Sequence, residues 1–176
     1  CTQIVRGLLE FARESKPQKT WTDINDLIEK TVLLLENKAS FQNIRIVKQL
    51  KPDLPLILVD RAKIQQVFWN FMINACEAMP NGGQLTITTD LSENKKAIEI
   101  RFIDTGVGIP LEHMNKIFDP FFTTKPSGTG LGLAICYGII QQHNGAIEVK
   151  SEPGRGTVFT LYIPLETKDI AMKGGN

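Results

Sequence analysis

The segment GTGLGLAICYGII, residues 128–140, places a glycine-rich turn directly before an apolar helix. Such a turn offers free backbone N–H groups and the positive end of the helix dipole, and both favour the binding of a phosphate chain. The glycine spacing matches neither GxxxxGK followed by Ser or Thr nor a GxGxxG that follows a strand, so it indicates neither a P-loop nor a Rossmann fold. The sequence therefore predicts phosphate binding on a different nucleotide-binding fold.

A helix is expected from about Asp60 to Met79, and it is apolar around most of its circumference. Its polar positions form one narrow stripe, which consists of Lys63, Gln66, Asn70, Asn74 and Glu77. Polar side chains on a largely buried helix need hydrogen-bond partners. Two interpretations of the asparagines stay open. Either they bond nearby backbone, or an amide oxygen serves as a neutral ligand of Mg²⁺, which takes few protein ligands together with phosphate oxygens.

The segment DTGVGIP, residues 104–110, ends the alternating stretch AIEIRFID, residues 97–104. A carboxylate at the end of a strand accepts a hydrogen bond from a flat ligand, and glycines at 106 and 108 let the backbone approach that ligand closely. Adenine presents an amino donor where guanine presents a carbonyl oxygen, so an ionised Asp104 favours ATP over GTP. In isolation, the same residues also fit an ordinary turn.

The order of the predicted elements indicates an α/β sandwich. Helices are expected after the cap residues Thr22 and Asp23, over residues 60–79 and over residues 131–143. Strands are expected at residues 44–50, 56–60, 84–90, 97–104, 146–151 and 157–165. The helices then pack on one face of a mixed sheet. The chain between residues 105 and 129 is predicted to be a loop with one short helix, and loops of that length are usually functional or disordered.

The composition excludes several classes of protein. With 176 residues, of which 42% are hydrophobic, and a formal net charge of +1, the chain suits one globular domain. No long basic run is present, so we expect neither nucleic acid nor direct contact with an anionic membrane. No apolar stretch is long enough to cross a bilayer, and we expect a cytoplasmic location within a parent protein whose membrane anchoring stays open. The cysteines indicate neither a disulfide framework nor a zinc site.

Five motifs in a fixed order resemble those of one protein family. They are the segment that contains Asn70 and Asn74 (QQVFWNFMINACEAMP, 65–80), DTGVG (104–108), FDPFFTTK (118–125), GTGLGL (128–133) and GRGTVF (154–159). They resemble the N box, the first glycine box, the F box, the second glycine box and the last glycine box of the catalytic, ATP-binding domain of sensor histidine kinases. That domain belongs to the GHKL, or Bergerat-fold, superfamily with gyrase and heat-shock chaperone ATPases. The resemblance covers roughly residues 21–166.

The resemblance implies a two-layer α/β sandwich, the Bergerat fold, in which helices cover one face of a mixed, mainly antiparallel sheet. Residues 105–129 are expected to form an ATP lid, in which Phe118, Phe121 and Phe122 are anchors while residues 123–130 flex over the phosphates. Three divisions of the chain are implied: the end of a dimerisation and phosphoacceptor hairpin with its linker (1–20), the catalytic domain (21–166) and a disordered tail (167–176).

The resemblance also assigns roles to individual residues. The catalytic set is Asn74 as the Mg²⁺ ligand, Asn70 near the metal or the phosphates, and Lys125 as a positive charge for the γ-phosphate. Around the adenine, the implied contacts are Asp104, which reads the base, and Gly106, Gly108, Ile109 and Thr157. Around the phosphates, they are Thr124, Lys125, Gly128, Thr129, Gly130, Leu131 and Gly132. ATP and Mg²⁺ are the implied cofactors.

One position departs from the pattern of many histidine kinases. They carry lysine or arginine three residues after the metal-binding asparagine, whereas this chain has Glu77. Lys125 and Lys116 are both candidates to supply the missing positive charge, and the sequence does not choose between them. Glu77 resembles the acidic residue in the N-box variant of nitrogen-regulation-type kinases, so we expect that variant here.

The residue four positions before Asn74 is Asn70, where the ATP-hydrolysing relatives carry a glutamate as the base for water, so slow hydrolysis is expected. The expected phosphate acceptor is a histidine. Neither His113 nor His143 has the sequence context of the family's acceptor, and His143 is predicted to lie at a helix end, against the dipole. We therefore expect the acceptor on a hairpin outside these residues, in a homodimer that passes phosphate to a response-regulator aspartate.

Two other classes of function stay open at this point. The first is an ATP hydrolase or ATP-driven clamp of the same superfamily, against which Asn70 argues. The second is a degenerate kinase that acts as an interaction module without catalysis, against which the complete glycine boxes argue. Turnover of ATP and binding of Mg-ATP distinguish the three.

Overall fold

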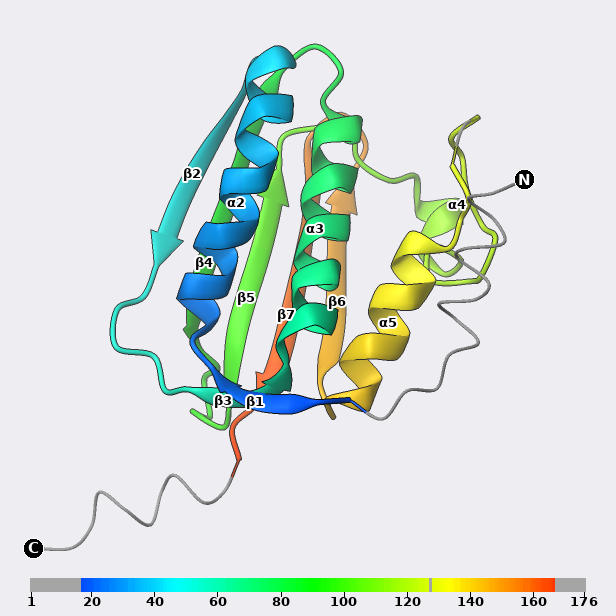
Figure 1. Cartoon of the computed structure of the whole chain (residues 1–176). Coiled ribbons are helices and arrows are strands. Elements are labelled where there is room, and N and C mark those ends of the chain that lie inside the picture. Colours follow the sequence, from blue (N-terminus) through cyan, green and yellow to red (C-terminus); the bar gives the residue numbers. More distant parts are fainter. Residues whose placement is uncertain (1–16, 127, 167–176) are drawn as a thin grey trace, which may run out of the picture.

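The computed structural model describes residues 17–126 and 128–166, which form two layers (Figure 1). One layer is a five-stranded sheet of order β2-β4-β5-β7-β6. Its strands are β2 (Ile44–Leu50), β4 (Gly83–Leu91), β5 (Ala97–Asp104), β6 (Ala146–Glu152) and β7 (Gly156–Pro164). The other layer is α2 (Ile24–Phe41), α3 (Arg61–Ala78) and α5 (Gly132–Gln142), which lie on one face of the sheet. The predicted two-layer α/β sandwich is confirmed.

The sheet is mixed and mainly antiparallel, as expected. β2 runs parallel to β4, and the pairs β4–β5, β5–β7 and β6–β7 are antiparallel. In β5, Ile98, Ile100 and Phe102 are buried, because alternate side chains of a strand point to opposite faces. Phe102 packs against Phe71 of α3 with ring centroids 5.7 Å apart. The core therefore fills the space between the helices and the covered face of the sheet.

The predicted ends of α2 and α3 are set by aspartate caps. Asp60 Oδ1 accepts a hydrogen bond from the Lys63 N–H at 3.1 Å, and Asp23 Oδ1 accepts one from the Asp26 N–H at 3.1 Å. Thr22, the other expected cap, instead lies in a strand. After α3, Gly82 has a φ of +87°, and a Cβ there would lie 2.8 Å from the Asn43 carbonyl oxygen. Both ends of α3 thus agree with the sequence prediction.

The short strand β1 (Lys19–Thr22) is the main difference from the expected elements. It pairs antiparallel with β3 (Ile57–Asp60) in a separate two-stranded sheet, with Lys19 opposite Asp60. Lys19 and Thr20, which the expected division of the chain assigns to the linker, therefore lie in a strand of the fold. Four residues are too few to give a periodic signal, and the strand depends on its partner β3. The helix expected in residues 1–15 and the tail expected in residues 167–176 lie outside the described residues.

His143 joins the C-terminal end of α5 to the N-terminal end of α3. It is 3% exposed, and its Nε2 accepts a hydrogen bond from the Asp60 N–H at 3.0 Å. Its Nδ1 therefore carries the proton and donates to the Ile139 carbonyl at 2.7 Å. The predicted position at a helix end is confirmed, and the hydrogen bond to Ile139 satisfies one of the last carbonyls of α5.

We expect the stability of the domain to depend on His143 between about pH 7 and pH 5. Burial lowers the pKa of His143 below its ordinary value, although the Ile139 carbonyl and nearby Asp60 oppose this effect and Lys19 and Lys63 add to it. The unfolded chain therefore takes up the proton first as the pH falls, at about 6.5, and the free energy of unfolding decreases. Urea unfolding at both pH values measures this change.

The His143→Phe variant tests the same feature at constant pH. It removes both hydrogen bonds but keeps an aromatic ring, so a loss of about 2 kcal/mol is expected at pH 7 because a buried donor and acceptor are left without partners. Its stability should also vary less with pH than that of the wild type. The matched control is His113→Phe, which should keep the wild-type pH dependence. Equal pH dependence in His143→Phe and the wild type would contradict the assignment.

Candidate nucleotide-binding site

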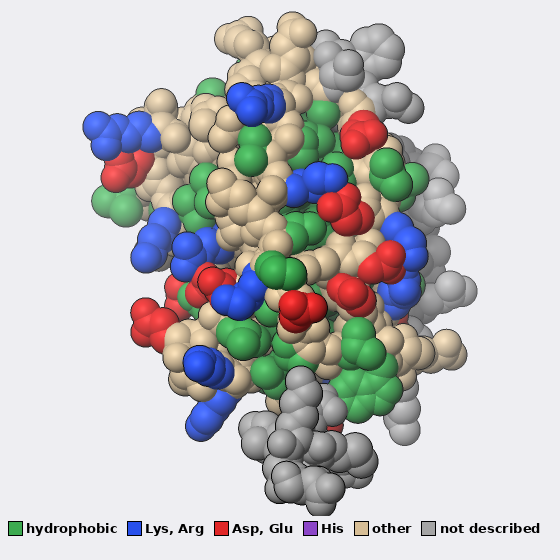
Figure 2. Space-filling view, turned by 90° about the vertical axis from the view of Figure 1, so that its left-hand side faces the viewer, with side chains coloured by type: hydrophobic (Ala, Val, Ile, Leu, Met, Phe, Trp, Pro, Cys, Tyr) green, Lys and Arg blue, Asp and Glu red, His purple; other side chains and the backbone are tan. Residues whose placement is uncertain are grey.

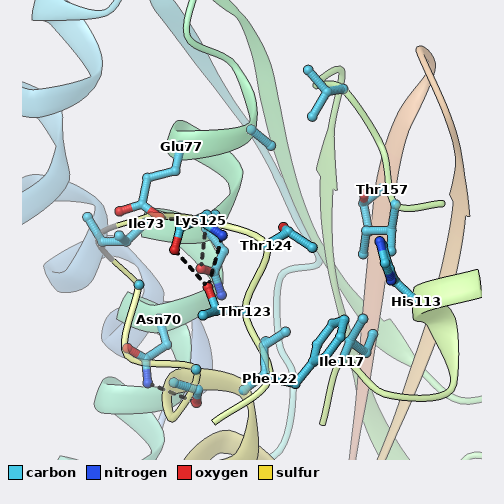
Figure 3. Close-up of a pocket in the computed structure, with 18 of the residues that line it drawn as sticks. Asn70, Ile73, Glu77, His113, Ile117, Phe122, Thr123, Thr124, Lys125 and Thr157 are labelled. Atoms are coloured by element: carbon cyan, nitrogen blue, oxygen red, sulfur yellow. Dashed lines mark hydrogen bonds and ion pairs between the residues drawn. The ribbon is translucent and has the colours of Figure 1, made fainter. Parts of the chain in front are cut away.

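A cavity of about 790 Å³ lies between α3, the C-terminal end of β5 and the start of α5 (Figure 3). Residues before and after the short helix α4 (Leu111–Met114), among them Gly108, Ile109, Thr124 and Lys125, also contribute to its lining. Most of the predicted site residues line it: Asn70, Asn74, Asp104, Gly108, Ile109, Thr124, Lys125, Gly128, Thr129, Gly130, Gly132 and Thr157. Gly106 and Leu131 are outside the lining. Residues far apart in the sequence therefore meet around one cavity.

Asp104 occupies the end of the cavity formed by β5 and β7. Its Oδ1 accepts hydrogen bonds from the N–H groups of Gly106 at 2.9 Å and Thr157 at 3.2 Å. Within residues 17–126 and 128–166 no other group hydrogen-bonds this carboxylate, so Oδ2 is available to a ligand. Burial raises the pKa of Asp104 above its ordinary range, while the two N–H groups act in the opposite direction. A well-fixed carboxylate with one unused oxygen results.

The glycines beside Asp104 allow close backbone contacts. A Cβ on Gly106 would lie 2.5 Å from the Ala78 carbonyl oxygen, to which the Val107 N–H donates at 3.0 Å. Gly108 has a φ of +72°, and its Cβ would lie 2.2 Å from the Glu152 carbonyl oxygen. Gly106 thus belongs to the expected turn, but it seats that turn against the end of α3 and does not line the cavity.

Ser151 of β6 supports the same end of the cavity, and the sequence analysis missed it. Its hydroxyl lies 2.9 Å from the Thr157 hydroxyl, donates to the Gly156 carbonyl at 2.9 Å and accepts from the Ile109 N–H at 2.8 Å. These contacts attach the start of the segment 105–129 to the sheet. The only signal was a polar residue at the end of an alternating strand, which is also typical of a turn.

The two asparagines of α3 have different partners. Asn70 Nδ2 donates to the Gly132 carbonyl at 3.4 Å and lies 3.4 Å from Cys136 Sγ, so it connects α3 to α5. Burial raises the pKa of the Cys136 thiol to about 12, and this thiol is inert at neutral pH. Asn74 Oδ1 accepts instead from Lys125 Nζ at 3.3 Å (Figure 3). The backbone interpretation thus fits Asn70, whereas Asn74 presents its oxygen to a cation.

Lys125 is the lysine that the fold places at the cavity. Its Nζ lies 2.5 Å from Glu77 Oε2 as well as 3.3 Å from Asn74 Oδ1. Lys116, the other candidate, is exposed and lies outside the lining. Of the two candidate lysines, Lys125 is therefore the one that lies at the cavity, and its role toward the phosphates stays a prediction.

The predicted aromatic anchors behave differently from one another. Phe118 packs on Tyr137 of α5 with ring centroids 5.6 Å apart, and Phe122 packs on His113 at 5.4 Å. The prediction is wrong for Phe121, whose side chain is 57% exposed. Phe121 contributes its backbone: its N–H donates to the Gly130 carbonyl at 2.9 Å, and a Cβ on Gly130 would lie 2.4 Å from its carbonyl carbon. His113 and Phe122 line the cavity, and the sequence analysis did not place them there.

The donor set at Asn74 fits a cation that is bound by few protein ligands. Among the described residues, no group of three or more His, Cys, Asp or Glu side chains is placed to hold a metal ion. The Asn74 and Glu77 oxygens nevertheless hold a positive charge, the ammonium of Lys125. Mg²⁺ commonly uses one or two protein oxygens and completes its shell with phosphate oxygens and water. Asn74 is compatible with such a role.

Residues 59–167 match the family model described as histidine kinase-, DNA gyrase B- and HSP90-like ATPase, and this match covers more than half of the chain. The chain belongs to this ATPase family. Its cavity, lined by the helix with Asn74, by Asp104 and by a glycine-rich turn, lies entirely within the residues that match this family. The expected superfamily is thereby confirmed, whereas the nitrogen-regulation variant of the N box stays a prediction.

Named relatives place the ATPase domain among histidine kinases. Over 164 residues, the chain is 41% identical to the signal transduction histidine-protein kinase AtoS of Escherichia coli (strain K12), covering 93% of this chain and 27% of AtoS. Similarly, sporulation kinase C of Bacillus subtilis (strain 168) is 39% identical, with 91% and 38% covered. The chain thus spans between roughly a quarter and two fifths of these relatives.

Solved structures share the fold of this ATPase domain. The catalytic domain of histidine kinase ThkA is 36% identical, with a TM-score of 0.74 over 84% of this chain and 95% of that domain. ThkA has also been solved in complex with the response regulator protein TrrA, with 32% identity and a TM-score of 0.80 over 94% of this chain and 47% of ThkA. Full-length ShkA in complex with AMPPNP has a TM-score of 0.83 at 28% identity, over 92% of this chain and 35% of ShkA.

The surface of the ATPase domain carries both signs of charge. The side that bears the β2 edge has acidic and basic side chains interspersed (Figure 2). Ion pairs in this part of the fold join Lys48 to Glu29 and Lys51 to Asp90. Among the described residues, no helix has both the length and the apolar character needed to cross a membrane.

Proposed function

We propose that this domain binds ATP with Mg²⁺ and transfers the γ-phosphate to a histidine on a dimerisation hairpin of the same parent protein. One observation carries the proposal. A single cavity has an unused carboxylate oxygen of Asp104 at one end and the Asn74 oxygen with the Lys125 ammonium at the other. A carboxylate oxygen accepts a hydrogen bond from a base, whereas an amide oxygen that holds a metal ion and an ammonium group both suit a phosphate chain. The histidine-kinase relatives support the choice of acceptor.

At the adenine end, Asp104 is the residue that reads the base. Its Oδ1 is held by the Gly106 and Thr157 N–H groups, so Oδ2 accepts a hydrogen bond from the exocyclic amino group of adenine. Guanine presents an acceptor at that position and leaves the carboxylate unpaired. Gly108, Ile109 and the Thr157 side chain border the same end of the cavity. We therefore expect selectivity for ATP over GTP.

At the phosphate end, Asn74 would hold Mg²⁺ through its side-chain oxygen. When bound, Mg²⁺ neutralises charge on the phosphate oxygens during phosphoryl transfer. The residues of the chain contribute position and shielding. The segment 128–131 leads into α5, whose first turn offers backbone N–H groups to the phosphates. We expect the lid segment, which contributes residues to the cavity lining, to close over the bound nucleotide and exclude water.

In the proposed reaction, a ring nitrogen of the acceptor histidine bonds to the γ-phosphorus while the bond to the ADP oxygen breaks. His143 does not fit this role because it is buried and both ring nitrogens are engaged. His113 packs on Phe122 within the cavity lining. The acceptor therefore comes from another part of the parent protein. The complex of ThkA with TrrA supports a response regulator as the next partner, and we place the domain in the cytoplasm, where ATP is available.

The test uses γ-labelled ATP, this chain and the separately produced hairpin of the same parent protein. Acid-labile label on the hairpin, dependent on Mg²⁺ and on the chain, is the expected result. Label released only as inorganic phosphate would indicate an ATP hydrolase instead. Normal nucleotide binding without any turnover would indicate a regulatory interaction module. A hairpin with its acceptor histidine replaced by glutamine is the control for nonspecific labelling.

A further inference from the structure

The contact between Lys125 and Glu77 joins the expected lid to α3. The two residues are 48 positions apart, and their side chains are about two-fifths exposed, at 41% and 39%. Lys125 Nζ reaches Glu77 Oε2 and Asn74 Oδ1 at the same time, so the ammonium lies against the oxygen that we assign to the metal (Figure 3). A charge from the lid is thereby placed at the phosphate end of the cavity.

The charge balance of the cavity depends on this contact. Glu77 and Asp104 both line the cavity, and Lys125 is the single lysine or arginine among its described lining residues. Without Lys125, the Glu77 carboxylate would face the triphosphate unpaired and repel it. Lys63, on the same stripe of α3, is directed elsewhere, because its Nζ donates to Gln142 Oε1 at 3.2 Å. The helix therefore does not supply the positive charge from its own side chains.

Asn74 alone is not a sufficient partner for Lys125 in the loaded site. Once its oxygen coordinates a divalent cation, that oxygen no longer serves the ammonium as a hydrogen-bond acceptor. Glu77 is the partner that stays available to Lys125 when Asn74 is engaged. An ammonium on a flexible stem needs such a partner to keep one position, because its rotamer entropy is large.

We propose that Glu77 is a positioning residue that holds the Lys125 ammonium beside Asn74, so that the lid supplies the positive charge that reads the terminal phosphate of ATP. The proposal rests on the proposed function and adds a residue to it. Glu77 does not touch the nucleotide and acts through Lys125. The acidic residue that replaces the usual N-box cation is then half of an ion pair whose cation comes from the lid.

The test compares nucleotides that differ only in the terminal phosphate. Titration calorimetry on the 176-residue chain in Mg²⁺ gives the dissociation constants of ADP and of a non-hydrolysable ATP analogue, and their ratio measures the triphosphate preference. In Lys125→Gln, this preference should fall about tenfold with ADP affinity nearly unchanged, because a contact with a charged group is lost. In Glu77→Gln, it should fall about threefold, as expected for losing a partly exposed ion pair.

Exchanging the charges of Lys125 and Glu77 tests whether Glu77 positions the ammonium or only stabilises the fold. Lys125→Glu alone should lower the triphosphate preference more than tenfold, because a second carboxylate then joins Glu77 at the phosphate end of the cavity. Adding Glu77→Lys to that variant returns a cation and its partner to the same place, so most of the preference should be recovered. Lys116→Gln, which removes an exposed lysine of the same segment, is the matched control and should behave as the wild type.

The outcomes distinguish this proposal from the proposed function. Failure of the wild-type chain to bind either nucleotide overturns both. A wild-type triphosphate preference that survives Lys125→Gln overturns the role of the lid lysine and leaves ATP binding intact. A preference that is lost in Lys125→Gln but unchanged in Glu77→Gln, with no recovery in the exchanged pair, overturns the positioning role of Glu77. Thermal unfolding of each variant verifies that the fold is retained.

Discussion

Replacing Asp104 with asparagine is expected to weaken ATP binding by about 100-fold, with little change in the affinity for inorganic triphosphate. The amide keeps one oxygen for the Gly106 and Thr157 N–H groups, but it places an NH₂ donor against the amino group of adenine. Loss of a hydrogen bond to a charged group costs about 1.5–3 kcal/mol, and the mismatched donors add to it. Calorimetric titration with ATP, GTP and triphosphate measures the effect. The selectivity for ATP over GTP should shrink at the same time.

The pH dependence of ATP affinity is a second test of whether the ionised Asp104 carboxylate binds adenine. Burial raises the pKa of this carboxyl, so its proton returns at a higher pH than on an exposed aspartate. Only the ionised form accepts from adenine with full strength, and the affinity therefore declines as the pH falls toward that pKa. The ratio of wild-type to Asp104→Asn affinity removes the titration of the nucleotide itself. The control, Asp90→Asn, changes an exposed strand-end aspartate that pairs with Lys51. Unchanged ATP affinity in Asp104→Asn would rule out this carboxylate as the reader of the base.

Replacing Asn74 with alanine is expected to lower phosphate transfer to the hairpin at least 100-fold, or about 3 kcal/mol of transition-state stabilisation. The reason is that Asn74 presents the one neutral amide oxygen at the cavity that already accepts from a cation, Lys125. Nucleotide affinity measured without Mg²⁺ should change less than about threefold, since base recognition at Asp104 is untouched. The rate should also lose most of its dependence on Mg²⁺ concentration.

Two other asparagine variants serve as comparisons for Asn74→Ala. Asn115→Ala removes an exposed asparagine of the same lid segment, outside the cavity lining, and should leave transfer unchanged. Asn70→Ala removes the connection from α3 to the Gly132 carbonyl and should lower stability rather than the response to Mg²⁺. If Asn74→Ala transfers phosphate with the wild-type dependence on Mg²⁺, the metal is held by other residues.

Most of the fold could be predicted because its elements carry strong local patterns. The alternation in β5 and the nearly all-apolar surface of α3 specify their structure within short windows of sequence. β1 was missed because a strand of four residues has no pattern of its own, and its hydrogen bonds come from β3, which lies 35 or more residues away. Phe121 was misplaced for a related reason: a positive φ of 69° turns its side chain to solvent, and aromatic composition does not reveal that.

The candidate site also contains residues that the sequence could predict and contacts that it could not. Asp104 and Asn74 could be found because each belongs to a motif of contiguous residues. The contact between Glu77 and Lys125 could not, since it joins two motifs through side chains whose meeting depends on the shape of the segment 105–129. The sequence showed that a cation was missing from α3 and offered two lysines, and the choice between them needed the structure. Ser151 belongs to no motif, and its role appears only when β6, β7 and Ile109 meet.

The attachment of β1 has a mechanical consequence for the domain. The Gln18 N–H donates to Asp60 Oδ2 at 3.0 Å, so the strand that enters the domain is fixed to the N-terminal end of α3. Asn74 lies 14 residues further along this helix, which corresponds to about 20 Å at 1.5 Å per residue. A displacement of the segment that contains Gln18 would therefore be transmitted to the N-terminal end of α3, the helix that also carries Asn74. With Mg²⁺ and the phosphates held at Asn74 as proposed, a change in the angle of this attachment is expected to reorient the terminal phosphate while the residues that bind it stay the same.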